Sequence, residues 1–178
     1  MQFRNILTLL LAALFAVSCS SARILTPEGE RVPGCYRYHI SWDCPGPDNS
    51  GNMHVDEEGH LRFLPDGTFV DHALQHHYLF LADSSAERYD FDYYCEGEWK
   101  ASEGKYLMRE HAKNFSMKLV GDNSPERLLF ADKIFRYYTP RDRWVTYTIE
   151  RLDRRWFVWS LVYPDGQKML WPMKRTRQ

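Results

Sequence analysis

The feature that most constrains this chain is a period-two alternation of apolar and polar residues that begins near Gly34. Four apolar residues at every second position open the pattern: Tyr36, Tyr38, Ile40 and Trp42. Such alternation is typical of a strand with one buried face. It recurs at 89–101, 115–120 and 156–163, whereas no window of about eleven residues after the N-terminal segment holds a convincing helical stripe. The sequence therefore predicts an all-β domain.

Turn sequences divide the alternating segments into short strands. Pro65-Asp66-Gly67 and Pro164-Asp165-Gly166 combine a fixed proline φ with a glycine that accepts positive φ. Glu57-Glu58-Gly59 and 121–126 are also interpreted as turns, and 128–138 with 144–152 as a pair of strands. Roughly eight to ten evenly spaced strands predict a barrel or a sandwich.

The first eighteen residues have the composition of a signal peptide. Arg4 precedes an apolar stretch from Ile6 to Val17, which is too short for a stable membrane anchor. Ala16-Val17-Ser18-Cys19 resembles the bacterial lipobox, which implies acylation of Cys19, and Ser20 resembles the pattern that directs lipoproteins to the outer membrane. The alternative is a secreted protein cleaved after Ala22.

We expect three parts: a signal peptide at 1–18, a tether at 19–33 and one domain at 34–178. Either reading of the N-terminus places this domain outside the cytoplasm. Formal net charge is only −1, which does not favour nucleic acid as a partner. Charge is uneven, however, because 19–110 has 8 basic and 17 acidic residues and 111–178 has 14 basic and 7 acidic. Either the halves form cross-strand salt bridges or two oppositely charged faces exist.

Three cysteines remain after Cys19, and an oxidising compartment allows one disulfide among them. If 35–42 is one strand, Cys35 and Cys44 lie more than about 20 Å apart, too far to bond. Cys44–Cys95 or Cys35–Cys95 remains. We favour Cys44–Cys95, because both residues are in phase with the apolar faces of their segments.

Candidate catalytic groups give weak signals. His72, His76 and His77 lie near Asp71, but His72 and His76 would be about 13 Å apart along a strand, too far for one metal ion. We expect these polar residues on a solvent face. Asp90, Asp92, Glu96 and Glu98 share a strand face, which we also expect to be solvated. No nucleophile elbow or phosphate-binding loop is present in the sequence, so we expect no catalysis, metal or cofactor.

Two short motifs carry a family resemblance. Leu61 to Phe69 reads L-x-F-x-x-D-G-T-F, and Gly97-Glu98-Trp99 followed by Leu107 reads as a G-x-W strand and its return. This arrangement resembles the lipocalin-like domains of bacterial envelope lipoproteins, over about Gly34 to Leu119. The resemblance implies an antiparallel up-and-down barrel. Gly34-Cys35-Tyr36 stands where a typical lipocalin has its own G-x-W.

Aromatic residues make up 15% of the chain, and this excess is the compositional feature that we expect to bear on function. Seven of them would share one side of the sheet: Tyr36, Tyr38, Trp42, Phe63, Phe69, Tyr93 and Trp99. They either fill the core or line a cavity. We predict a cavity for a small apolar ligand that touches Tyr38, Trp42, Phe69 and Trp99. The alternatives are a structural or stress-sensing lipoprotein that docks an envelope protein, and a metal-binding protein or hydrolase.

Overall fold

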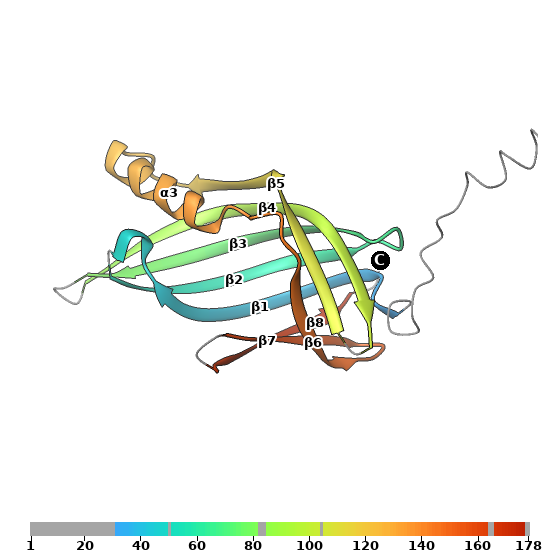
Figure 1. Ribbon diagram of the computed structural model, residues 1–178. Coiled ribbons are helices and arrows are strands. Elements are labelled where there is room, and N and C mark those ends of the chain that lie inside the picture. The colour runs from blue at the N-terminus through green and yellow to red at the C-terminus, as the bar shows by residue number, and fades with distance from the viewer. Residues whose placement is uncertain (1–30, 50, 82–84, 104, 164–165, 177–178) are drawn as a thin grey trace, which may run out of the picture.

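The structure, a computed structural model, describes residues 31–49, 51–81, 85–103, 105–163 and 166–176. Within these ranges eight antiparallel strands form a closed barrel in chain order, and β8 pairs with β1 (Figure 1). The elements are β1 (Gly34–Pro45), η1 (Pro47–Asn49), β2 (Asn52–Phe63), β3 (Thr68–Phe80), β4 (Ala86–Ser102), β5 (Lys105–Val120), α3 (Pro125–Tyr138), β6 (Val145–Leu152), β7 (Trp156–Val162) and β8 (Lys168–Arg175). The predicted all-β, up-and-down barrel is confirmed, with eight strands.

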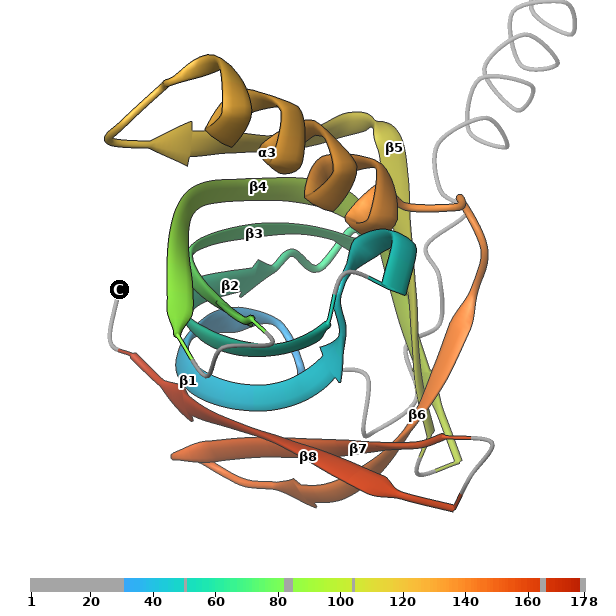
Figure 2. The same ribbon diagram turned by 90° about the vertical axis from the view of Figure 1, so that its left-hand side faces the viewer.

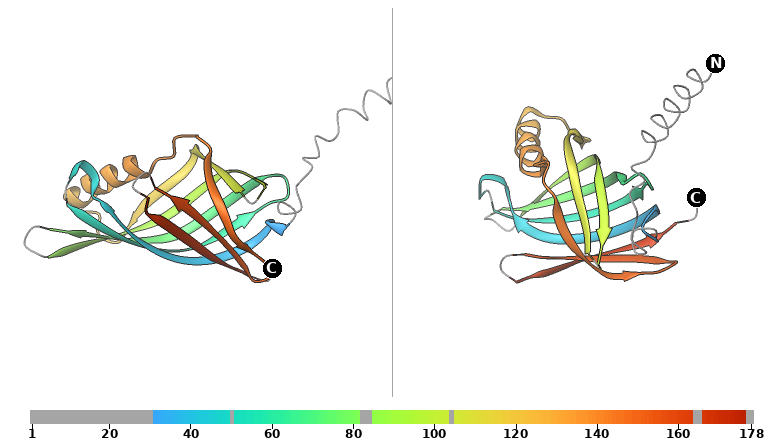
Figure 3. Two further views of the ribbon diagram at one scale, coloured as in Figure 1. Left: turned by 60° about the horizontal axis from the view of Figure 1, so that its bottom comes forward. Right: turned by 45° about the vertical axis from the view of Figure 1, so that its right-hand side comes forward.

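The barrel wall follows the alternation in the sequence. Tyr36, Tyr38 and Ile40 are buried inside, whereas Arg37 and His39 point outward. Figure 3 shows the end of β8 beside the start of β1, where three residue pairs close the barrel. The seam between β5 and β6 is also short, with four residue pairs from Lys105 to Met108. Beyond Met108 no pairing with β6 continues, and this part of β5 lies next to α3.

One end of the barrel is filled by aromatic side chains. Phe63 lies at its centre, with ring centroids 5.4–6.3 Å from five other rings. Those rings belong to Tyr36, Phe69, Trp99, Tyr106 and Phe157. Val32, placed in the predicted tether, is fully buried against this core, and its carbonyl accepts a hydrogen bond from Tyr36 Oη at 2.7 Å. We call this the closed end.

The two motifs behind the family resemblance meet at the closed end. Trp99 donates its backbone N–H to the Gly67 carbonyl at 2.8 Å and its indole Nε1–H to the Leu64 carbonyl at 3.0 Å. Gly97 is required by close packing, because a Cβ there would lie 2.1 Å from the Arg109 carbonyl oxygen. The G-x-W strand thus fastens the 64–67 turn to the barrel.

Two predicted elements are wrong. Glu57-Glu58-Gly59 is no turn, because β2 runs unbroken from Asn52 to Phe63. Residues 125–138 form helix α3 rather than a strand (Figure 2). Ser124 is its N-cap residue, Pro125 occupies the first turn, and Ala131 and Ile134 are buried. No helix in the described ranges is long and apolar enough to cross a membrane.

The outer face pairs histidines with aspartates. His39–Asp56, His54–Asp43, His72–Asp92 and His76–Asp90 each have an N···O distance of 2.7 Å. The solvent face predicted for His72, His76 and the β4 carboxylates is confirmed. Among Lys and Arg ion pairs of the described residues, only Lys133–Asp48 joins the acidic half to the basic half. Salt bridges between the halves therefore do not explain the charge asymmetry.

Candidate functional site

Polar side chains enter the barrel from three neighbouring strands. Tyr38 on β1, Glu57 on β2, and Asp71 and Gln75 on β3 all line one interior cavity. Gly59 and Ala73 lie between these groups and present almost no side chain. A Cβ at Gly59 would lie 2.7 Å from the Tyr38 hydroxyl oxygen, so the glycine lets the phenol ring lie flat against β2.

The Tyr38 hydroxyl lies between two carboxyl groups. Its oxygen is 2.5 Å from Glu57 Oε1 and 2.9 Å from Asp71 Oδ1. A phenol has one proton to donate, so the second contact requires that a carboxyl group donate to the phenol oxygen. Burial raises the pKa of Glu57 and, more strongly, that of Asp71, with added repulsion from Glu57. The three groups therefore hold at least one extra proton.

Gln75 extends this cluster to His77. Gln75 Nε2 donates to Glu57 Oε2 at 2.7 Å, and Gln75 Oε1 lies 2.9 Å from His77 Nε2. An amide oxygen only accepts, so His77 carries its proton on Nε2. Burial lowers the pKa of His77 to about 3, so the ring is neutral at physiological pH. His77 is fully buried, which corrects the expectation that all three histidines lie on a solvent face.

Glu110 on β5 is the third carboxyl group of the cavity. Burial, followed by repulsion from Glu57, raises the pKa of Glu110 to about 7. No described residue forms a hydrogen bond or ion pair with its carboxyl group. Glu110 also lines a hollow of about 350 Å³ beside the short β5–β6 seam, together with the segment from Thr139 to Arg143 and with Val145. A group titrating near neutral pH inside a cavity is a functional-site candidate.

The cavity itself measures about 170 Å³. Aromatic rings make up half of its fourteen lining residues: Tyr38, Trp42, Tyr93, Tyr138, Tyr147, Trp159 and Trp171. The remaining lining residues are the carboxyl groups, Gln75, Leu61, Met108 and Met173. A mainly apolar pocket with a few convergent polar groups is the usual form of a small-molecule site.

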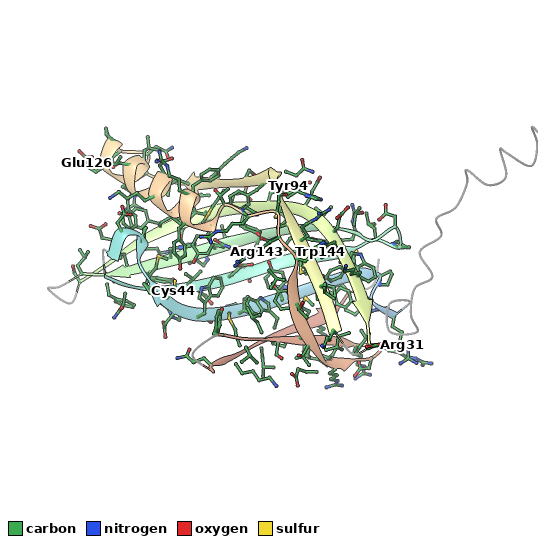
Figure 4. All side chains as sticks on the ribbon, viewed as in Figure 1. Arg31, Cys44, Tyr94, Glu126, Arg143 and Trp144 are labelled. Atoms are coloured by element: carbon green, nitrogen blue, oxygen red, sulfur yellow. The ribbon has the colours of Figure 1, made fainter. Side chains whose placement is uncertain are left out.

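A wide mouth adjoins the cavity at the end opposite the closed end. It measures about 800 Å³ and shares Trp42, Tyr138 and Trp171 with the cavity. Cys44, Tyr163 and Met169 form part of its rim. Figure 4 shows Cys44 at this end of the barrel and Arg31 at the other.

The four predicted ligand-binding residues fall into two groups. Tyr38 and Trp42 line the cavity. Phe69 and Trp99, each 1% exposed, belong to the closed-end core and are not among the cavity's lining residues. The alternating pattern correctly predicted that all four face inward, but it could not tell at which level of the barrel the core ends and the cavity begins.

The predicted Cys44–Cys95 disulfide is wrong for this structure, because both residues are free cysteines. Through the strand register Cys44 stands level with Glu87 of β4. Cys95 is eight residues farther along that strand, which is about 26 Å. The alternative Cys35–Cys95 is not formed either. Burial raises the pKa of the Cys95 thiol, so it packs as a small apolar group.

Two further points of the sequence analysis concern the lipidation residue and a metal site. Cys19, the predicted lipidation residue, lies outside the described residues. No group of three or more His, Cys, Asp or Glu side chains in the described parts of the chain is arranged to hold a metal ion.

Comparison with known proteins gives a likeness to solved structures alone. No family model matches the sequence, and no curated protein matches it. A solved structure of a lipocalin-like protein from Bacteroides uniformis is similar over 82% of this chain and 99% of its own, with 14% identity and a TM-score of 0.36.

Proposed function

We propose that this chain is a lipid-anchored protein of the bacterial cell envelope whose barrel binds a small amphiphilic molecule without transforming it. The observation that carries the proposal is the partly open cavity of about 170 Å³ adjoining a mouth of about 800 Å³. A barrel of eight strands can be filled by side chains alone. Here the closed end is filled, and the opposite end is hollow and lined by rings.

The site supports an amphiphile rather than a purely apolar ligand. Trp42 and Trp171 line both the cavity and the mouth, which gives an apolar path inward. The path ends at Tyr38, Glu57 and Asp71, which offer hydrogen bonds. A ligand with an apolar body and one polar group would match both parts.

The binding function is tested by native mass spectrometry of the protein purified from its own membranes, together with uptake of an apolar fluorescent probe. Trp42→Ala should weaken probe uptake and leave the fold intact. Trp144→Ala is the matched control, because Trp144 packs against Lys100 and Arg109 and does not line the cavity. Absence of both a co-purified molecule and probe uptake would rule out the proposal.

Trp99→Ala should act differently from Trp42→Ala. Its ring is buried in the closed end, so we expect a loss of about 3–5 kcal/mol in the free energy of unfolding. Urea denaturation measures this loss. A stable Trp99→Ala variant with impaired probe uptake would place the ligand site at the closed end instead.

The anchor is a separate part of the proposal. Arg31 lies at the closed end, so a chain tethered through Cys19 would carry its mouth on the end away from the attachment. Cys19→Ala should release the protein from membranes into the soluble fraction. If the variant still sediments with salt-washed membranes, the lipid anchor is wrong.

A second candidate function is acid–base chemistry on the bound molecule. It is favoured by the raised pKa of Glu110, about 7, and by the shared proton at Tyr38, Glu57 and Asp71. Mass spectrometry separates the two functions. A single molecule recovered intact supports binding, whereas a mixture that changes in composition on incubation with wild-type protein, but not with Glu110→Gln, supports catalysis.

A further inference from the structure

The cavity is lined by acidic residues without any basic residue. Glu57, Asp71 and Glu110 line it, and no Lys, Arg or His is among its lining residues. His77, the nearest basic group of the buried cluster, binds to Gln75 and is neutral. Three carboxyl groups without a counter-ion in a low-dielectric interior are costly unless each is protonated or meets a cation.

Glu110 is the carboxyl group with no partner. Glu57 and Asp71 are hydrogen-bonded to Tyr38, but no described side chain or backbone group bonds to the Glu110 carboxyl. Its side chain is partly buried and lines the cavity. An acid without a protein partner on the wall of a cavity is placed to bind a group that enters that cavity.

The walls near the carboxyl groups are rings of the type that bind organic cations. Tyr147 and Trp159 pack with ring centroids 3.9 Å apart, and Trp159 and Trp171 lie 5.3 Å apart. All three line the same cavity as Glu110. The face of an aromatic ring attracts ammonium groups, and cages of such rings recognise substituted amines.

No cationic side chain of the described residues pairs with the carboxyl group of Glu110. Arg141 and Arg143 line the neighbouring hollow, but neither forms an ion pair with Glu110 among the described residues. Asp142, which lies between them in sequence, has its Oδ1 atom 3.2 Å from His111 Nδ1. A bare metal ion is also disfavoured, because no described group of three acidic, histidine or cysteine ligands converges.

We propose that the ligand of the cavity is a small organic cation, an amine or ammonium group carrying an aromatic or aliphatic substituent, whose charge pairs with Glu110 inside the aromatic walls. This rests on the proposed binding function. A volume of about 170 Å³ holds about six groups of water size. The substituent therefore extends into the mouth past Trp42 and Trp171.

Binding of a cation is linked to proton release. Glu110 must be ionised to pair with the ammonium group, and its pKa is about 7 in the absence of ligand. The affinity for a cation should therefore rise with pH across this value. Titratable and charged groups face Glu110 from every adjoining element: Tyr38, Glu57, Asp71, Tyr93, Cys95, Tyr138, Tyr147, Arg141, Asp142 and Arg143. Of these, Glu57 and Asp71 are the other two carboxyl groups of the cavity, and burial raises the pKa of both.

The experiment compares three probes of similar size by calorimetry: phenethylamine, phenethyl alcohol and phenylpropanoate. At about pH 8 the amine should bind at least tenfold more tightly than the alcohol, and the carboxylate should bind most weakly. The affinity of wild-type protein for the amine should fall by about thirtyfold between pH 8 and pH 5.5, because the ionised fraction of Glu110 falls by that factor, while the affinity for the alcohol stays constant.

Glu110→Gln should lower the affinity for the amine by at least about tenfold and remove its pH dependence, with no change for the alcohol. Glu57→Gln tests the second carboxyl group. Its matched control is Glu58→Gln, the next residue of β2, which points outward with its side chain 54% exposed. The wild-type comparison of probes keeps the test decisive if a variant does not fold.

The outcomes separate the two proposals. Tighter binding of the alcohol or the carboxylate than of the amine overturns the organic cation but leaves small-molecule binding in place. Binding of the apolar fluorescent probe without binding of any of the three compounds also overturns the organic cation and leaves small-molecule binding in place. If neither the fluorescent probe nor any of the three binds, both proposals fail.

Discussion

At the scale of single residues, Gly59 controls the site without contacting a ligand. A Cβ at this position would lie 2.7 Å from Tyr38 Cζ and 2.8 Å from the Ala73 Cβ. Gly59→Ala should therefore push the Tyr38 ring away from Glu57 and Asp71. We expect a loss of about 1–3 kcal/mol in the free energy of unfolding, measured by urea denaturation.

The Tyr38 ring provides the control for this prediction. In a Tyr38→Ala background the same Gly59→Ala change should cost clearly less, because only the contact with Ala73 remains. A penalty of equal size in both backgrounds would show that the ring does not depend on the glycine.

The sequence predicted the inward side of Tyr38 and Trp42, but not that Asp71 and His77 are turned inward, nor the role of Gly59. The alternation places Asp71 and His77 on one face of their strand, and both do point inward. A glycine after two glutamates is typical of a turn. The glycine is instead required by a side chain 21 residues away in sequence, the Tyr38 ring on β1, and single-sequence patterns do not report such contacts.

At the scale of elements, α3 covers the outer end of the polar cluster. Tyr138, its last residue, packs edge-on against the His77 ring at a centroid distance of 5.3 Å, and it lines both the cavity and the mouth. Ile134 is fully buried beneath the helix, whereas Leu129 is 66% exposed.

These two residues give a matched pair of substitutions. Ile134→Ala should lower the free energy of unfolding by about 2–4 kcal/mol through the cavity it leaves. Leu129→Ala should change it by less than about 0.5 kcal/mol. Equal effects in urea denaturation would mean that α3 does not pack on the barrel as described.

The helix escaped prediction because apolar residues occur on both of its faces. Ala131 and Ile134 are buried, but Leu128, Leu129 and Tyr137 are exposed, so no clean stripe at helical spacing is visible. The Ser124-Pro125-Glu126 sequence did carry a helix-start signal, with a capping residue, a first-turn proline and an acidic residue. The same residues also belong to the 121–126 segment, whose composition fits a turn.

At the scale of the whole molecule, two ionisable groups inside the barrel change the free energy of unfolding in opposite directions as pH rises. The pKa of Glu110 is raised from 4.5 to about 7, so its contribution to stability is full below pH 4.5 and is lost as pH rises through about 7. The pKa of His77 is lowered from 6.5 to about 3, so its contribution is full above pH 6.5 and is lost as pH falls toward 3. The wild-type pH profile mixes both effects.

Glu110→Gln isolates the first effect, because glutamine has nearly the same shape and does not titrate. The variant should be about 2–3 kcal/mol more stable than wild type at pH 8, where the native protein must hold an ionised carboxylate in its cavity. The difference should shrink as pH falls through 7 and vanish below pH 4.5, where Glu110 becomes neutral in both the folded and the unfolded chain. Urea denaturation at four pH values across this range measures it. A difference that stays constant with pH would mean that Glu110 is solvated. Its ionised carboxylate would then not destabilise the fold, and it would not need a cation as a partner.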